Sequence, residues 1–250
     1  MKKELYFKKK ELKNIDDLIV NFNSKEFKSP LRSTIPLLQM YNFEPDNSFG
    51  LIDTILEKNI KYIFEYETPV LKGQGSASCT DLMIVSDNSC IAIEAKWTEP
   101  PYQIIKNWLG ESENKKLVLE GWVEIISEYC EIHLDSKILY DLPYQLIHRV
   151  ASACLLNKSQ SNIVYLIFEL NKVKKNYYEQ KLSSLSKIIG HKVNFYIANY
   201  KIEKLDEQRR LENLWNNKER DLSKDVIAGL LNNSLIIVSK EEVKNVSNFV

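Results

Sequence analysis

The chain contains 250 residues, of which 44% are hydrophobic and 27% are charged. That length supports one sizeable core, and the composition is typical of a soluble globular protein with one or at most two domains. The 34 basic and 34 acidic residues cancel to a net charge of zero, which excludes a strong global basic field and counts against a protein that coats nucleic acid non-specifically. A local basic patch remains compatible with this balance.

Cellular location and redox state are indicated by two further features. The chain begins M-K-K-E without the apolar stretch of a secretory signal, and no run approaches the ~20 apolar residues of a membrane span. The four cysteines lack C-x-x-C spacing and lie in apolar runs, at Cys79, Cys90, Cys130 and Cys154. They indicate buried free thiols rather than disulfides or a zinc site. We therefore expect a cytoplasmic protein that makes no contact with a membrane.

The N-terminal segment is highly charged. Residues 1–13 contain six lysines and two glutamates, a local net charge of +4. Such runs usually form a solvated face, so we predict a charged arm at about residues 1–28; an arm that contacts phosphates is the alternative. Ser33 and Thr34 then precede Pro36 in an apolar run and predict the start of a helix, and a second helix is expected over residues 49–58.

Three acids precede the most informative stretch of the chain. Glu44 lies between the two expected helices. Glu65 and Glu67 lie in residues 61–70, whose alternation predicts a strand, and both would share a face with Ile63. They are either functional carboxylates or exposed acids on an edge strand. Residues 72–78 contain two glycines and two serines, and this loop either lets the backbone approach a phosphate or simply closes a hairpin.

Residues 79–97 read C-T-D-L-M-I-V-S-D-N-S-C-I-A-I-E-A-K-W, two β-rich runs joined by a turn at residues 86–89. The first run contains Asp81. The second contains Glu94 and Lys96, which share one face because side chains alternate along a strand. The apolar neighbours indicate burial on both faces, where an acid and a lysine are costly unless a charged group lies between them. A divalent cation and a phosphate would satisfy both side chains.

This arrangement, an acid on one strand and E-x-K on the next, resembles the PD-(D/E)xK nuclease superfamily. The resemblance implies that Asp81 and Glu94 hold Mg²⁺, or Mn²⁺ in its place, helped by the carbonyl of Ala95. Lys96 would orient or deprotonate the attacking water and offset charge on the phosphorane. The chemistry of Mg²⁺ agrees, because this ion takes one or two carboxylates, keeps several waters and makes a bound water more acidic. Thr80 stands where the written motif has proline.

The same resemblance implies a third acid, which related nucleases take from an early helix or from the first strand of the site. Glu44, Glu65 and Glu67 are the candidates in this chain. We assign Glu67 to the metal site, with the choice among the three left open.

Residues 142–156 predict an amphipathic helix whose second face is polar, with Gln145, His148, Arg149 and Ser152. In several branches of the superfamily a Gln-containing helix lines the active site, so the resemblance implies that Gln145 steadies Lys96 or a metal-bound water. Arg149 would then bind a phosphate oxygen. The alternative is a polar face turned to solvent, and a lone histidine on a helix is usually structural.

Strands and helices alternate in the rest of the chain. Strands are expected over residues 162–170, 192–200 and 234–239, and helices over 101–109, 117–130, 177–189 and 203–232, with Trp122 in the core. Residues 171–192, from the end of the first of these strands to the start of the second, contain six lysines and one glutamate. Lys174 and Lys175, close to two tyrosines, would suit a groove that follows a nucleic-acid strand, and a solvated helix face is the alternative.

We therefore predict a single α/β domain over residues 1–250, with a restriction-endonuclease-like mixed central sheet flanked by helices. The predicted function is Mg²⁺-dependent endonucleolytic hydrolysis of DNA, of restriction or defence type, with RNA as the alternative substrate; restriction-type enzymes are often homodimers. One alternative is a catalytically inactive nuclease-fold module that binds nucleic acid or a protein partner. Another is a globular protein whose E-x-K is incidental, which predicts that Asp81 and Glu94 lie too far apart to share an ion.

Overall fold

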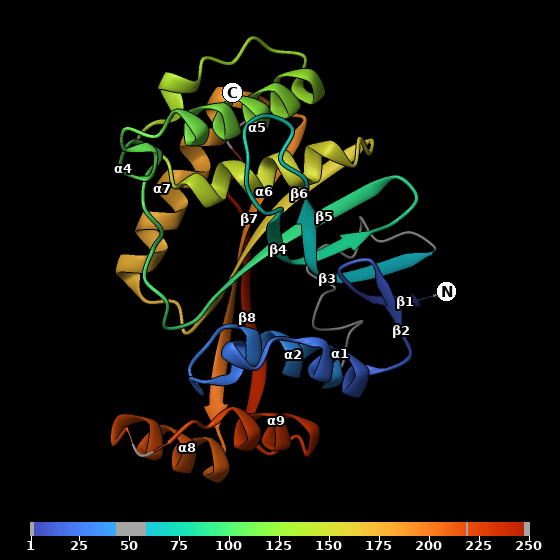
Figure 1. Cartoon of the computed structure of the whole chain (residues 1–250), viewed down its shortest axis with the longest axis vertical. Helices are drawn as coiled ribbons and strands as arrows, with labels where there is room; N and C mark the ends of the chain where they lie inside the picture. The colour runs from blue at the N-terminus through green and yellow to red at the C-terminus, as the bar shows by residue number, and fades with distance from the viewer. Residues whose placement is uncertain (1–2, 44–58, 219, 248–250) are drawn as a thin grey trace.

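The computed structural model describes residues 3–43, 59–218 and 220–247, and in these ranges one eight-stranded mixed sheet forms the centre of the molecule (Figure 1). Its strand order is β2-β1-β3-β4-β5-β6-β7-β8. The strands are β1 (Lys3–Phe7), β2 (Lys10–Leu12), β3 (Ile60–Thr68), β4 (Ser78–Val85), β5 (Ser89–Lys96), β6 (Gln160–Phe168), β7 (Val193–Lys204) and β8 (Ile236–Asn245). The β1–β3, β5–β6 and β6–β7 pairs are parallel, and the other pairs are antiparallel.

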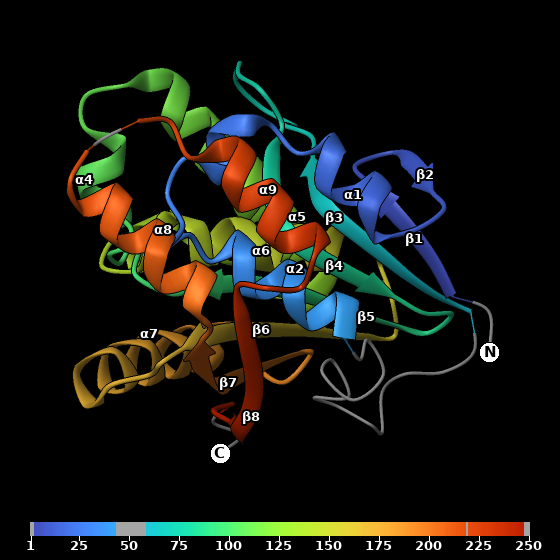
Figure 2. The ribbon, with the colours of Figure 1, turned by 90° about the horizontal axis from the view of Figure 1, so that it is seen from below.

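Helices cover both faces of the sheet (Figures 1 and 2). One layer contains α1 (Ile15–Asn21), the 3-10 turn η1 (Ser24–Phe27), α2 (Thr34–Phe43), α8 (Asp206–Asn216) and α9 (Ser223–Leu231). The other contains α4 (Ile105–Leu109), α5 (Glu113–Cys130), the turn η3 (Ser136–Leu139), α6 (Tyr144–Leu155) and α7 (Lys172–Ile189). Each layer packs its own apolar cluster against the sheet. The predicted α/β class, with a mixed sheet flanked by helices, is confirmed.

Strand β5 is buried at every residue. Ile91, Ile93 and Ala95 pack toward the α2 layer, whereas Cys90 and Ala92 pack toward the α6 layer. This is the burial on two faces that the apolar sequence predicted, and it follows from the central place of β5 between β4 and β6.

Strands β4 and β5 separate before they end. Their ladder stops at the Leu82–Ile93 pair, although β4 stays paired with β3 back to Ser78 and β5 stays paired with β6 as far as Lys96. From Asp81 and Glu94 onward, the two neighbours are therefore no longer joined by ladder hydrogen bonds. The gap gives polar side chains a place inside an otherwise apolar sheet.

The predicted N-terminal arm is wrong, because residues 3–28 belong to the fold. Strand β1 pairs with both β2 and β3, and α1 and η1 complete the segment. Leu5 and Leu12 oppose each other in the β1–β2 pair and are buried, while the lysines at 8, 9, 10 and 13 are exposed. The high local charge concealed an alternating pattern with a single buried face.

Other helix boundaries in the structure also differ from those predicted. The helix expected over residues 101–109 begins only at Ile105, and residues 203–232 form two helices, α8 and α9. The helix expected over 49–58 and the candidate Glu44 lie outside the described residues.

Across the described ranges, no helix has the length and apolar character needed to cross a membrane. Three cysteine thiols are buried, Cys79 is half-buried, and all four are free.

A substitution at Leu5 tests the place of the N-terminal segment in the sheet. Leu5 is buried, so Leu5→Ala should lower the free energy of unfolding by about 2–4 kcal/mol through lost burial and a cavity. Lys9→Ala at the exposed β1–β2 turn is the control and should change stability by less than about 0.5 kcal/mol. Urea unfolding of the three proteins measures both values. A Leu5→Ala protein as stable as the Lys9→Ala control would instead support a solvated N-terminal arm.

Candidate active site

Three carboxylates lie side by side on adjacent central strands. The β3–β4 register places Glu65 opposite Asp81, between the Phe64–Leu82 and Tyr66–Thr80 pairs. The β4–β5 register, continued by one residue, places Asp81 opposite Glu94. Like charges so close repel each other, so the fold must supply protons or cations to hold them together.

Glu94 is the most deeply buried of these acids, with 1% of its surface exposed. Its Oε1 accepts a hydrogen bond from Lys96 Nζ, and its Oε2 accepts one from Arg149 Nε. Burial favours the protonated acid, but the charges of Arg149 and Lys96 outweigh it and hold the pKa of Glu94 below its ordinary value. Glu94 is therefore an ionised carboxylate inside the protein.

Arg149, which is 2% exposed, also contacts the second acid. Its Nη2 lies 3.5 Å from Asp81 Oδ1, while Asp81 Oδ2 accepts a hydrogen bond of 2.8 Å from the Ala95 backbone. Burial and the charge of Glu94 raise the pKa of Asp81 to about 6, against the opposing effect of Arg149. One guanidinium thus contacts both acids.

His148 fixes the guanidinium from behind. Arg149 Nη1 lies 2.6 Å from His148 Nδ1, and because arginine has no acceptor, this nitrogen must accept. The ring proton then lies on Nε2, 3.1 Å from the Ser152 hydroxyl, which in turn bonds Thr68 at 2.6 Å. Burial and Arg149 lower the pKa of His148 well below its ordinary value, so the ring is neutral.

The polar side of α6 is therefore an interior surface. His148, Arg149 and Ser152 are all buried, so the alternative of a solvent face is wrong for these three residues. They lie on α6 where it packs against β4, β5 and β6. The sequence pattern of one apolar and one polar face did not distinguish a polar interior from solvent.

A series of aromatic rings holds Lys96 and leads back to His148. Lys96 is 3% exposed, and its Nζ lies 4.1 Å from the centre of the Tyr102 ring. Ring-centre distances of 6.0, 5.0, 5.6 and 5.3 Å then connect, in order, Tyr102, Tyr144, Trp108, Trp122 and His148. Trp122 is a core residue, as predicted. The two buried cations are thus positioned by one continuous wall.

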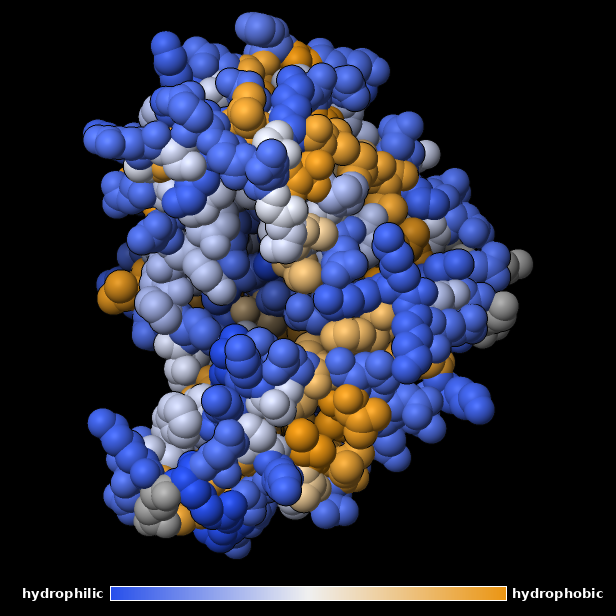
Figure 3. All heavy atoms as spheres, in the orientation of Figure 1, coloured by the Kyte–Doolittle hydropathy of each residue, from blue (hydrophilic) through white to orange (hydrophobic). Residues whose placement is uncertain are grey.

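A cavity of about 70 Å³ adjoins the carboxylates. One water needs about 10–15 Å³ measured this way, so the cavity has room for several. Its strand side is formed by Glu65, Asp81, Ala95 and Lys96, and the opposite side by Arg32, Ser33, Thr34, Glu99 and Tyr102, among others. In the view of Figure 3 the surface is hollowed between the two helix layers.

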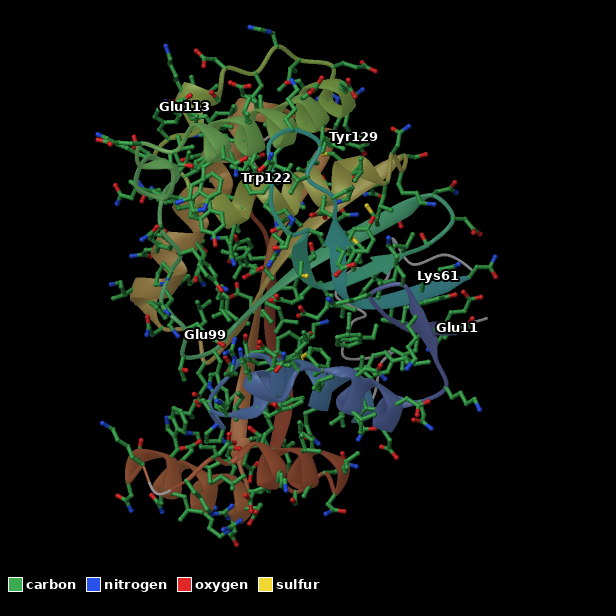
Figure 4. The ribbon with its side chains drawn as sticks, in the orientation of Figure 1. Glu11, Lys61, Glu99, Glu113, Trp122 and Tyr129 are labelled. Carbon is green, nitrogen blue, oxygen red and sulfur yellow. The ribbon has the colours of Figure 1, made fainter. Side chains whose placement is uncertain are left out.

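Glu99 joins the segment after β5 to the start of α2. Its carboxylate accepts hydrogen bonds from the backbone N–H groups of Ser33, at 2.7 Å, and Trp97, at 2.9 Å. Figure 4 shows Glu99 where the segment between β5 and α4 approaches the α2 layer. Both elements that border the cavity are therefore fixed relative to each other.

Glu65 lies in this cavity in an unusual backbone conformation. Its φ of 51° is left-handed, within a strand, which costs about 1–2 kcal/mol for a residue other than glycine. Burial, followed by the charge of Asp81, raises the pKa of Glu65 to about 7. Glu67, the acid assigned to the metal site, instead forms an ion pair of 2.8 Å with Lys8 and does not line the cavity. The structure brings Glu65, and not Glu67, to Asp81.

The remaining predicted residues are dispersed. Gln145 lies in the first turn of α6 and its buried Oε1 has no hydrogen-bond partner, but Gln145 does not line the cavity. Lys174 donates to the carbonyl of Trp97, just beyond β5. Lys175 pairs with Glu242 at 3.1 Å on β8. Of the two lysines, only Lys174 is tied to the end of the strand that carries Lys96.

The donor set suits Mg²⁺ in its chemistry. Asp81 and Ala95, which line a cavity with room for waters, supply hard oxygen donors, and Glu94, opposite Asp81 in the register but outside the lining, supplies another. The described residues contain no cluster of three acid, histidine or cysteine side chains arranged around one ion position. Mg²⁺ commonly uses only one or two carboxylates and fills its other positions with water and phosphate, so two acids are sufficient. Each Glu94 oxygen already accepts from one cationic side chain, so a metal ion bound by Glu94 would compete with, and be repelled by, Lys96 and Arg149.

Sequence reasoning missed three residues of the site, Arg32, Glu99 and Tyr102. The sequence does mark two of them: Glu99 and Tyr102 flank the Pro-Pro pair in E-P-P-Y, which closely follows the strand that ends in Lys96. A rigid turn at that position directs the chain back across the strand end. Arg32 precedes an ordinary helix start, and no pattern marks it.

Residues 11–217 match the family model described as Domain of unknown function (DUF6946), and the chain belongs to this family. The matched region contains all the site residues described above. The comparisons with curated proteins and with solved structures gave no match.

The pKa of Glu65 makes stability depend on pH. A carboxyl whose pKa is raised on folding stabilises the folded state more when it is protonated than when it is ionised. Its contribution to the free energy of unfolding is therefore lost as the pH rises through about 7. In metal-free buffer, Glu65→Gln should therefore be more stable than the wild type by on the order of 2 kcal/mol at about pH 8, and the gain should vanish near pH 4. Urea unfolding across this range gives the measurement.

Glu67→Gln is the matched control for this experiment. Glu67 lies two residues away in a partly exposed ion pair, so its substitution should change stability by less than about 1 kcal/mol, without that pH profile. Equal profiles for the two variants would show that Glu65 does not face Asp81 in a buried site.

Proposed function

We propose that the chain is a Mg²⁺-dependent nuclease with a restriction-endonuclease-like fold, acting on phosphodiester bonds in DNA. The observation that carries the proposal is the separation of β4 from β5 at Asp81 and Glu94. Two carboxylates there share the Arg149 guanidinium, with Lys96 paired to Glu94, and Asp81 and Lys96 line a cavity large enough for water and a phosphate oxygen. The same three residues form the motif in the sequence.

Each residue has a role that its surroundings support. Mg²⁺ bound by Asp81, Glu94 and the Ala95 carbonyl would polarise the scissile phosphate and acidify a water. Lys96 pairs with Glu94 and lies against the face of Tyr102, two contacts that favour the ammonium form. Lys96 therefore acts as a hydrogen-bond donor to the phosphorane and as an orienting group for the attacking water, rather than as the base.

A second candidate function is supported by the engagement of both Glu94 oxygens. A nuclease-fold module that binds DNA, or a protein partner, without cutting needs no metal and would retain the Glu94 ion pairs permanently. The net charge of zero is in keeping with this candidate. The two candidates differ in whether cleavage depends on a metal and on Asp81.

Cleavage assays test the proposed nuclease. Wild-type protein should cut plasmid or single-stranded DNA with Mg²⁺ or Mn²⁺ and not with EDTA, and an RNA substrate is assayed in parallel. Asp81→Asn, at a side chain that is 27% exposed, should remove cleavage without unfolding the chain. Lys96→Met should lower the rate by about 10²- to 10³-fold through loss of charge stabilisation.

Glu67→Gln is again the control, and it should cut like the wild type. Metal-dependent cleavage retained by a folded Asp81→Asn protein would contradict the assignment. A folded wild type that cuts no substrate with either metal would favour the binding module.

A further inference from the structure

Arg149 lies between the two acids, in the position that a metal ion bound by both of them would occupy. It comes from α6, whereas both acids come from the sheet, and it contacts Glu94 through Nε and Asp81 through Nη2. Of the two acids, Lys96 forms an ion pair with Glu94 alone, and it belongs to the same strand as Glu94. Arg149 is therefore the cation that links the two carboxylates.

The charges of the four residues in direct contact balance. Asp81 and Glu94 supply two negative charges, and Lys96 and Arg149 supply two positive charges, while Glu65 lies beside Asp81 without contacting either cation. A divalent cation added to these four residues would leave excess positive charge in a region of low dielectric, which is strongly unfavourable. An anion that enters with the metal, or a displaced Arg149, removes part of this cost.

Arg149 is also arranged so that it can release one acid and keep its other contact. The Nη2–Asp81 distance of 3.5 Å is longer than a good hydrogen bond, while Nη1 is fixed at 2.6 Å from His148. Asp81 lines the cavity. Arg149 itself is not among the residues that line the cavity, so a phosphate oxygen would reach its guanidinium at Asp81 and would compete with that carboxylate, because guanidinium groups bind phosphates well.

We propose that Arg149 is the resting counter-ion of the Asp81–Glu94 pair and couples metal binding to phosphodiester binding. A phosphodiester oxygen draws Arg149 away from the acids, and the vacated carboxylate oxygens accept the divalent ion. By linkage, each ligand then strengthens the other by the same factor. The inference rests on the proposed function in taking Asp81 and Glu94 as the metal ligands, and it is tested by binding rather than by cleavage.

The experiment measures Mn²⁺ binding by electron paramagnetic resonance of the free ion. Wild-type protein is titrated alone and with dimethyl phosphate, against chloride at equal ionic strength and against protein-free samples. Dimethyl phosphate should tighten Mn²⁺ binding by about fivefold or more. The reciprocal effect is measured with Mg²⁺, which is diamagnetic and suits NMR: Mg²⁺ should tighten dimethyl phosphate binding by a similar factor. Asp81→Asn should abolish the Mn²⁺ site.

Two variants separate Arg149 from the general charge of the cavity. Arg149→Lys keeps the positive charge but lacks the guanidinium that reaches both acids, and Arg149→Met removes the charge. Both should bind Mn²⁺ more tightly than the wild type in the absence of phosphate and should lose the coupling. Arg209→Met is the control, because Arg209 is an exposed arginine of α8 that pairs with Asp206 and does not line the cavity, and it should retain the coupling.

The outcomes distinguish this inference from the proposed function. Mn²⁺ binding that depends on Asp81 but is unaffected by dimethyl phosphate in the wild type would overturn the role of Arg149 and leave the metal site standing. That result needs no Arg149 variant to fold. Coupling that persists in a folded Arg149→Lys protein would also overturn it. Absence of Mn²⁺ binding under every condition would remove the metal site and, with it, both proposals.

Discussion

The buried carboxylate of Glu94 is the constraint on which the site depends. A single ionised acid in the centre of a sheet is costly, and Glu94 is stable there only because Lys96 and Arg149 each donate to one of its oxygens. Loss of one partner from such a cluster typically costs about 3–5 kcal/mol, because it leaves a charge without compensation. The positions of β5, α6 and the segment after β5 are therefore tied to this one carboxylate.

The rest of the architecture serves to place these charges. The separation of β4 from β5 opens the sheet at Asp81, and α6 presents Arg149 to the gap with His148 and Ser152 behind it. On the other side, Glu99 fixes the start of α2 against the end of β5 and so gives the cavity its second wall. The site is consequently made where the two helix layers meet an interruption of the ladder, and neither layer could form it alone.

Much of the fold and the centre of the site could be predicted from local pattern. The alternation and apolar character of residues 79–97 predicted two strands, their burial and the convergence of Asp81, Glu94 and Lys96. The predictions that were wrong have physical explanations. Residues 1–28 look like a solvated arm because lysines dominate a strand with only one buried face.

Other features depend on tertiary structure that no short pattern encodes. The left-handed backbone of Glu65, which turns it toward Asp81 in place of Glu67, is held by the surrounding sheet. The polar face of α6 is buried because it meets charges on β4 and β5, which lie more than fifty residues away in sequence. Tyr102 and Arg32 reach the site through packing between elements and not through a motif.

Diffraction from crystals grown with Mn²⁺ and a short thymidine oligonucleotide, with an anomalous difference map, shows whether the two carboxylates bind a metal ion. We expect a metal peak at direct coordination distance from oxygens of both Asp81 and Glu94, with the Arg149 guanidinium turned toward a phosphate. A map with Mn²⁺ and oligonucleotide bound elsewhere, and with Arg149 still between the two carboxylates, would contradict it.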